Sequence, residues 1–271
     1  MKFGFSTIGC PGWSWSEIIT TASDLGYDGV ELRGIGSEMY LPRVKEFSLE
    51  KIPALCAKMQ ELKLQIPCLT TNAFLFDSEK LEIARQEVVD YLNLASALAT
   101  PYIRVLGDAN PQPGTVDQAL VEENLLFLLP LAAEKNVTLL LETNGVYASS
   151  AKMKALLEKI NHPNLGVLWD IHHPYRFHGE PIAQTYNELK PWIKHVHMKD
   201  SVRTSSSVEY RMLTCGDIPA AEVVSLLFAD NYLGYLVLEW VKRWNSDLEE
   251  PGIVFPHYIN TIKKLLPEKT N

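Results

Sequence analysis

One pattern runs through the whole chain and constrains its fold more than any other feature. A short apolar segment is followed by a turn and then by a longer segment with helical periodicity, and this unit occurs eight times in 271 residues. The apolar segments are rich in Val, Ile, Leu and aromatic residues, as buried parallel strands are. The predicted strands cover residues 2–7, 28–34, 64–70, 102–108, 137–143, 165–171, 193–199 and 235–241.

The segments between these strands carry the signals of amphipathic helices. The stretch "SWSEIITTASDLG" begins with a serine typical of an N-cap and ends with a glycine typical of a helix terminus. In the helix predicted over residues 48–63, Pro53 must fall in the first turn, where a helix tolerates proline. The predicted helices cover residues 14–26, 48–63, 78–99, 115–136, 148–160, 180–190, 218–231 and 254–266.

Eight strand–helix units without a linker or low-complexity tract predict a single (β/α)₈ TIM barrel domain over residues 1–271. An open doubly wound sheet is the alternative, but such a sheet rarely uses eight evenly spaced units. The longest irregular connections, 34–49 and 201–216, each follow a predicted strand. In a barrel they lie at the mouth, where the carboxyl ends of the strands and the catalytic groups meet.

Composition narrows the class of partner. The chain is 46% hydrophobic and 21% charged, as globular proteins are, and its net charge is −8 with a pI near 5.4. It has no basic stripe, which argues against binding to nucleic acid. No segment is long and apolar enough for a membrane span or a signal peptide, and the four scattered cysteines suit reduced thiols. We therefore expect a cytoplasmic protein without nucleic-acid or membrane partners.

Four consecutive predicted strands each place one potential metal ligand near the carboxyl end: Glu142, Asp170, His197 and Glu239. The simpler interpretation is that each acidic residue marks where a strand reaches solvent. It explains one such residue more easily than three carboxylates and an imidazole on successive strands. This oxygen-rich set suits one divalent ion, Mn²⁺, Mg²⁺, Co²⁺ or Zn²⁺, with positions open for a substrate. A structural zinc site would instead recruit thiolates.

The stretch "HVHMKD" (195–200) places its two histidines on one face of the strand but at different depths. His195, His197 and Lys199 share one face of the strand, and the apolar residues between them share the other. Residues two apart lie ~6.5 Å apart along a strand, so only one histidine lies at ligand height. We predict that this is His197, that His195 supports it from deeper in the core, and that Lys199 contacts a substrate at the rim.

The sequence resembles the xylose isomerase-like barrel superfamily, in its sugar phosphate isomerase/epimerase branch. The motifs that carry the resemblance are "LLLETN", "LWDIHHP", "HVHMKD", "CGDIP" and "LVLEW", in this order. The branch includes ketose epimerases, hydroxypyruvate isomerase, inosose dehydratase and dehydroshikimate dehydratase. The resemblance implies that Glu142, Asp170, His197 and Glu239 are the metal ligands, and that Glu142 and Glu239 also exchange protons with the substrate.

The resemblance also suggests substrate-binding residues. His173 completes the D-x-x-H pattern that begins at Asp170, and its family counterpart contacts a substrate oxygen. Arg203 lies six residues beyond His197, as a substrate-binding arginine does in ketose epimerases, although a solvated loop charge is an equal alternative. Glu31 is expected in a supporting role near the mouth. Aromatic residues there are candidates for an apolar wall against a sugar or polyol, with packing of the rim as the alternative: Trp13, Trp15, Phe74 and Trp240.

Two departures from the family patterns limit the assignment. Ketose epimerases carry a further glutamate where this chain has Ala148, and the apurinic endonucleases need histidines on strands three and four, which are absent here. We expect a metal-dependent sugar or sugar phosphate isomerase or epimerase that abstracts a proton next to a carbonyl through an enediolate. The alternatives are a lyase that dehydrates a keto-cyclitol or dehydroshikimate, and a non-catalytic binding protein. The sequence leaves open whether the chain forms a homo-oligomer, since no segment identifies an interface.

Overall fold

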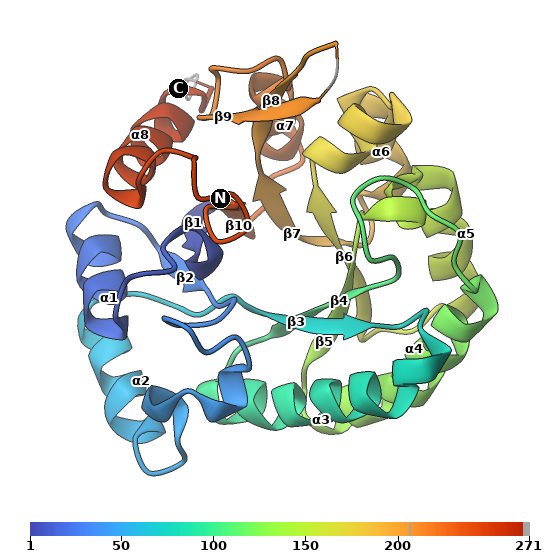
Figure 1. Cartoon of the computed structure of the whole chain (residues 1–271), viewed down its shortest axis with the longest axis horizontal. Coiled ribbons are helices and arrows are strands. Elements are labelled where there is room, and N and C mark those ends of the chain that lie inside the picture. Colours follow the sequence, from blue (N-terminus) through green and yellow to red (C-terminus); the bar gives the residue numbers. More distant parts are fainter. Residues whose placement is uncertain (206, 268–271) are drawn as a thin grey trace.

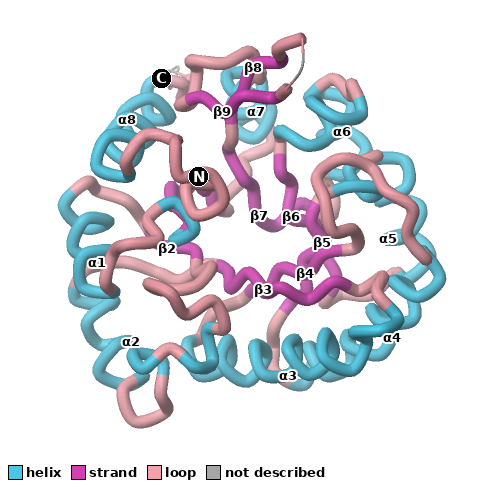
Figure 2. Tube along the Cα trace, in the orientation of Figure 1, coloured by secondary structure: helices cyan, strands magenta, loops and turns pink. Residues whose placement is uncertain are grey.

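The computed structural model describes residues 1–205 and 207–267, and it confirms the predicted TIM barrel (Figures 1 and 2). Eight parallel strands surround a common axis, and helices cover their outer side. The barrel strands are β1 (Lys2–Ser6), β2 (Gly29–Glu31), β3 (Cys68–Phe74), β4 (Tyr102–Leu106), β5 (Thr138–Glu142), β6 (Leu165–Asp170), β7 (Ile193–Met198) and β10 (Tyr235–Leu238).

The strand order is β2-β1-β10-β7-β6-β5-β4-β3, so the two ends of this sheet are β2 and β3. They meet at a seam formed by isolated bridges from Gly29 to Gln65 and from Leu32 to Leu69. The backbone N–H groups of Val30 and Leu32 donate across this seam at 2.9 and 3.1 Å. The barrel therefore closes, but through fewer ladder contacts than join its other strands.

The helices follow the predicted positions, with some differences at their ends. Ser14 caps α1 through a capping box with Glu17, and Pro53 lies in the first turn of α2. The α-helices are α1 (Trp15–Asp24), α2 (Ile52–Glu61), α3 (Leu81–Leu98), α4 (Gln118–Glu134), α5 (Ser150–Ile160), α6 (Ile182–Leu189), α7 (Ala220–Ala229) and α8 (Pro251–Lys264). Short helical turns cover Thr7–Gly9, Leu41–Arg43, Lys45–Phe47, Ser78–Lys80, Gly145–Ala148 and Pro174–His178.

Strand parity decides which side chains reach the barrel interior. On β7, Val196 and Met198 join the apolar core, whereas His195 and His197 contact polar groups. The same alternation places Leu139 and Leu141 of β5 in the core and brings Glu142 to the polar side. The interior of the barrel therefore contains a buried polar layer surrounded by hydrophobic packing.

The prediction of an irregular connection over 201–216 is wrong in part. The chain forms an antiparallel hairpin there, with strands β8 (Asp200–Arg203) and β9 (Val208–Arg211), above α7 in Figure 1. The carboxylate of Asp200 accepts hydrogen bonds from the backbone N–H groups of Ser201, Gly216 and Ile218. This buried aspartate thereby connects the start of the hairpin with the segment that follows it.

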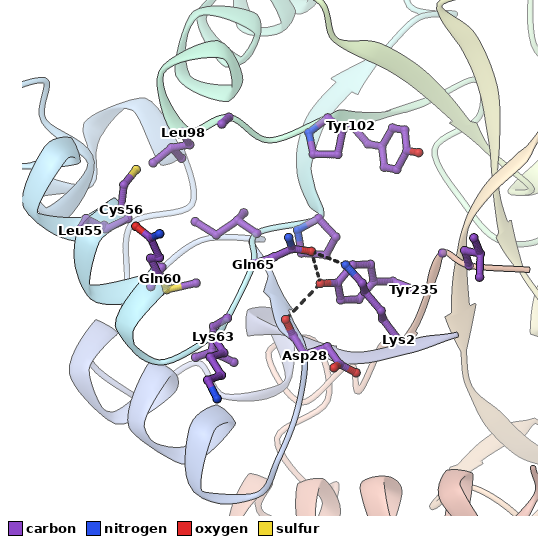
Figure 3. A pocket seen from close by; sticks show the side chains of 18 residues that line it. Lys2, Asp28, Leu55, Cys56, Gln60, Lys63, Gln65, Leu98, Tyr102 and Tyr235 are labelled. Atoms are coloured by element: carbon purple, nitrogen blue, oxygen red, sulfur yellow. Dashed lines mark hydrogen bonds between the residues drawn. The ribbon is translucent and has the colours of Figure 1, made fainter.

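A cavity of about 730 Å³ lies at the opposite end of the barrel from these loops (Figure 3). Its walls come from α2, the end of α3 and the amino-terminal ends of β1, β4 and β10. Lys2 Nζ and the Tyr235 hydroxyl both donate to Gln65 Oε1 within it. Among the described residues, no helix combines the length and apolarity that crossing a bilayer requires.

Candidate metal centre

The structure brings the four predicted metal ligands together. Glu142 and Asp170 end β5 and β6, His197 lies in β7, and Glu239 directly follows β10. Each is buried and offers one ligand atom, and these atoms lie within 4.8 Å of one another. Since these four strands are neighbours in the sheet, their carboxyl ends converge on one point of the mouth.

The donor set fits a divalent metal ion. His197 Nε2 is engaged by Glu31, whereas its Nδ1 lies 3.5 Å from Glu239 Oε1 and has no hydrogen-bond partner among the described residues. A buried imidazole nitrogen without a partner costs free energy unless another group uses its lone pair. Three carboxylates and one nitrogen are the ligands that hard or borderline divalent ions accept.

Asp170 has a fixed orientation at the end of β6. Its Oδ1 accepts backbone hydrogen bonds from His172 at 2.8 Å and His173 at 3.2 Å. Its Oδ2 faces Lys199 Nζ at 2.9 Å. Although burial raises the pKa of Asp170, its electrostatic interactions with His173 and Lys199 lower it more, so the group stays ionised. Only Oδ2 is therefore available to an additional cation.

Two buried cations offset the negative charge of the cluster. Lys199 Nζ contacts both Asp170 and Glu239, and the Nε atom of Arg104 lies 3.1 Å from Glu142 Oε2. Burial alone lowers the pKa of Lys199, but the carboxylates of Asp170 and Glu239 raise it well above its ordinary value. The sequence interpretation included Lys199 but missed Arg104, whose signal was a charged residue in the apolar strand "YIRVL".

The two glutamates differ in their affinity for protons. Burial raises the pKa of Glu142 to about 7, with Arg104 opposing the shift and Glu239 adding to it. The pKa of Glu239 is lowered, because Lys199 and His197 outweigh the effect of burial. For His197, burial lowers the pKa, but the charges of Glu31 and Glu239 raise it to about 9. Two carboxyl groups with opposite shifts lie in one site, as acid–base pairs do.

A second buried polar group adjoins the cluster through His197. Glu31 Oε2 is 2.8 Å from the Nε2 atoms of both His195 and His197, and all three side chains are fully buried. Burial raises the pKa of Glu31, but the two histidines lower it further, so its carboxyl group is ionised. His195 thus lies one layer deeper than His197, as expected from their spacing along the strand, and Glu31, at the carboxyl end of β2, lies between the two histidines.

The predicted substrate-binding residues divide into two groups. His173 joins the cluster: its Nδ1 lies 3.1 Å from the Thr143 carbonyl and 3.7 Å from Glu142 Oε1, and its Nε2 lies 3.5 Å from Lys199 Nζ. Burial lowers its pKa to about 4, while Asp170 opposes this shift. His173 is therefore neutral near pH 7 and within reach of an oxygen bound at the cluster.

The structure does not bring Arg203 to the cluster. It is exposed on β8, and its guanidinium donates to the backbone carbonyl of Arg176. Arg176, by contrast, is buried against the hairpin. The Arg176 guanidinium donates to Ser201 Oγ and to the Ser201 carbonyl. Sequence reasoning missed Arg176, which lies in the short helical turn after "DIHHP".

The aromatic candidates pack against the rim. Trp13 meets the ring of Phe255 edge-on at 5.5 Å, and Trp15 meets Phe47 edge-on at 5.4 Å. Trp240 is buried, and its indole N–H donates to the carbonyl of Glu249. Phe74 packs with Phe76. These contacts are those of the rim-packing alternative, although Trp13 and Trp15 stay partly exposed.

The chain matches a known protein family. The family model of the xylose isomerase-like TIM barrel matches residues 19–254, so the chain belongs to this family. Fructoselysine 3-epimerase of Escherichia coli O157:H7 is 26% identical over 280 residues, which cover 99% of each chain. A 3-dehydroshikimate dehydratase of Bacillus anthracis is 25% identical over 194 residues, covering 69% of this chain and 66% of that protein.

Solved structures agree on the fold. The probable 3-DHS dehydratase AsbF of Bacillus anthracis superposes with a TM-score of 0.77 at 19% identity, covering 97% and 99% of the two chains. D-Psicose 3-epimerase of Clostridium cellulolyticum H10, solved with D-tagatose, gives 0.75 at 18% identity over 98% and 99%. A barrel protein of Mycobacterium smegmatis in complex with magnesium gives 0.75 at 16% identity over 97% and 96%.

Proposed function

We propose that the chain is a divalent-metal-dependent sugar isomerase or epimerase that exchanges a proton next to a carbonyl group. The observation that carries this proposal is the buried set of Glu142, Asp170, His197 and Glu239. The strand order places β6 and β7 between β5 and β10, so the two glutamates flank the other two ligands. Such a pair is suited to remove a proton on one side of a substrate and return one on the other.

A divalent ion held by these residues would stabilise the negative charge that develops on the carbonyl oxygen of a substrate. Glu142, whose pKa is about 7, exchanges protons readily near neutral pH, and Glu239 stays ionised beside Lys199. His173 orients a hydroxyl or carbonyl oxygen, and the Lys199 ammonium adds positive charge at the same edge. Return of the proton to the opposite face gives epimerisation, and its return to the neighbouring carbon gives isomerisation.

The proposed substrate is a sugar-like small molecule with adjacent carbonyl and hydroxyl groups. The fructoselysine 3-epimerase relative supports this class, and the magnesium complex of a structural relative supports an ion such as Mg²⁺, Mn²⁺, Co²⁺ or Zn²⁺. The chain has no glycine-rich phosphate loop. We therefore propose unphosphorylated and phosphorylated sugars equally as substrates.

A dehydratase is the second candidate. The 3-dehydroshikimate dehydratase relative supports it, while Ala148, which stands where the ketose epimerases carry a glutamate, weakens a specific assignment as a ketose epimerase. Proton abstraction would then be followed by loss of a β-hydroxyl group instead of by reprotonation. The same two glutamates serve both reactions, since one removes the proton and the other protonates the leaving oxygen.

The test is incubation of the Mn²⁺-loaded protein in D₂O with a panel of ketoses, aldoses, fructosyl amines and 3-dehydroshikimate. An isomerase or epimerase gives a product that carries carbon-bound deuterium and retains its hydroxyl groups, whereas a dehydratase gives a product that has lost water. Glu142→Gln is expected to abolish the reaction, while Glu188→Gln, on the outer surface, leaves it unchanged. Full activity of Glu142→Gln would refute the assignment of this residue, and loss of water from an active substrate would favour the second candidate.

A further inference from the structure

The group formed by Glu31, His195 and His197 is not accounted for by the proton exchange proposed above. One carboxylate oxygen, Glu31 Oε2, accepts from two imidazoles at 2.8 Å each, and its strand β2 is separated from β7 by β1 and β10. Glu31 Oε1, by contrast, has no hydrogen-bond partner among the described residues. A fully buried carboxylate is costly unless it makes compensating interactions, so these two bonds carry much of its stabilisation.

This arrangement determines which nitrogen of each imidazole carries the hydrogen. An ionised carboxylate oxygen only accepts, so His195 and His197 both donate from Nε2. The Nδ1 of each imidazole is a bare lone pair when the ring is neutral, which is the form in which a histidine binds a metal ion. For His197, this Nδ1 faces Glu239 Oε1 at 3.5 Å and has no other partner among residues 1–205 and 207–267. The lone pair is therefore directed at the ligand cluster.

We infer that Glu31 is a positioning residue for the metal centre: it fixes the tautomer and ring orientation of His197 so that Nδ1 binds the ion. This inference rests on the metal centre in the proposed function. A carboxylate that holds the far nitrogen of a ligating histidine typically accounts for 10–100-fold in metal affinity. His195 shares the carboxylate but presents no nitrogen to the four-ligand set, so it restrains Glu31 rather than the ion.

The test measures metal affinity and ligand field instead of turnover. Mn²⁺ binding is followed through the electron paramagnetic resonance of the free ion, and Co²⁺ binding through its visible absorption. Glu31→Gln keeps the size of the side chain but replaces the charged acceptor with a neutral one. We expect its affinity for Mn²⁺ to fall by about 10–100-fold and its Co²⁺ spectrum to change.

A matched control comes from Glu180, a partly buried carboxylate that also accepts two hydrogen bonds, from the Ser150 N–H and the Thr185 hydroxyl. Glu180→Gln is expected to keep the wild-type affinity and spectrum. If Glu31→Gln does not fold, Glu31→Asp replaces it: the shortened carboxylate then weakens Mn²⁺ binding. His195→Gln leaves the Glu31–His197 bond in place and is expected to stay within about threefold of wild type.

The outcomes separate this inference from the metal centre itself. In the first outcome, wild type binds one ion, and Glu31→Gln (or Glu31→Asp in its place) binds it equally well with the same Co²⁺ spectrum. This result overturns the role of Glu31 and leaves the metal centre intact. Wild type that binds neither Mn²⁺ nor Co²⁺ overturns the metal centre, and this inference with it. Weaker binding and a changed spectrum in the Glu31 variant, with both retained in Glu180→Gln, support the inference.

Discussion

Lys199→Met removes an ammonium group that two carboxylates of the cluster share. Lys199 Nζ lies 2.9 Å from Asp170 Oδ2 and contacts Glu239, and the residue is only 3% exposed. Removal of one partner from a buried ion pair leaves an uncompensated charge and typically costs about 3–5 kcal/mol. Since 1 kcal/mol shifts the midpoint of a chain of this size by roughly 2–4 °C, we expect the metal-free variant to unfold about 10 °C below wild type.

A bound divalent ion would supply the positive charge that Lys199→Met removes. The difference in unfolding temperature between variant and wild type should therefore shrink when Mn²⁺ is added at saturation. If the ion restores about 2 kcal/mol of the loss, linkage requires that the variant bind Mn²⁺ more than tenfold more tightly than wild type. Thermal unfolding followed by circular dichroism, in EDTA and in Mn²⁺, measures both effects.

The matched control is Lys154→Met, because Lys154 pairs with Glu188 at 2.7 Å on the surface, where the two side chains are 38% and 41% exposed. Exposed pairs contribute little to stability, so this variant should unfold close to wild type with or without metal. Equal midpoints for the two variants in EDTA would refute the charge compensation by Lys199. A difference that Mn²⁺ leaves unchanged would show that the ion and the ammonium do not act on the same carboxylates.

Three further predictions follow from other features. Metal affinity should rise between about pH 6 and 9, because binding expels protons from Glu142 and His197, whose pKa values are raised to about 7 and about 9. Calorimetry in buffers of different ionisation enthalpy measures the released protons. Gly29→Ala should cost about 1–3 kcal/mol in unfolding free energy, because its Cβ would lie 2.5 Å from a backbone oxygen across the seam, whereas Gly252→Ala, with open space, should be neutral or stabilising. The exposed thiol of Cys215 should react with a disulfide reagent well before the two buried thiols, and equal rates would contradict the packing.

The barrel and the position of the four ligands could be predicted because both depend on strand periodicity. Each ligand lies at or near the carboxyl end of an apolar strand, and parallel strands in a barrel bring these ends together. The rise along a strand also separated His197 from His195 without any knowledge of their partners. These inferences need only the two-residue repeat of a strand and the order of the strands.

The charges around the ligands depend on contacts between distant strands, which periodicity does not specify. Arg104 pairs with Glu142, and Glu31 joins the two histidines, over sequence separations that no local pattern reveals. The loop residues were the least predictable. Arg203 matched a family spacing, but it lies exposed on the hairpin whereas Arg176 is buried, and that outcome depends on how the loop folds on itself.

The seam between β2 and β3 has a consequence for exchange with solvent. Glu31 ends β2, so the strand that closes the barrel also presents the carboxylate that holds His197. Any opening of the seam that draws β2 outward also separates Glu31 from that histidine. Ion binding and barrel closure should then protect one another, and metal should slow hydrogen exchange at the Val30 and Leu32 amides more than at amides of the outer helices.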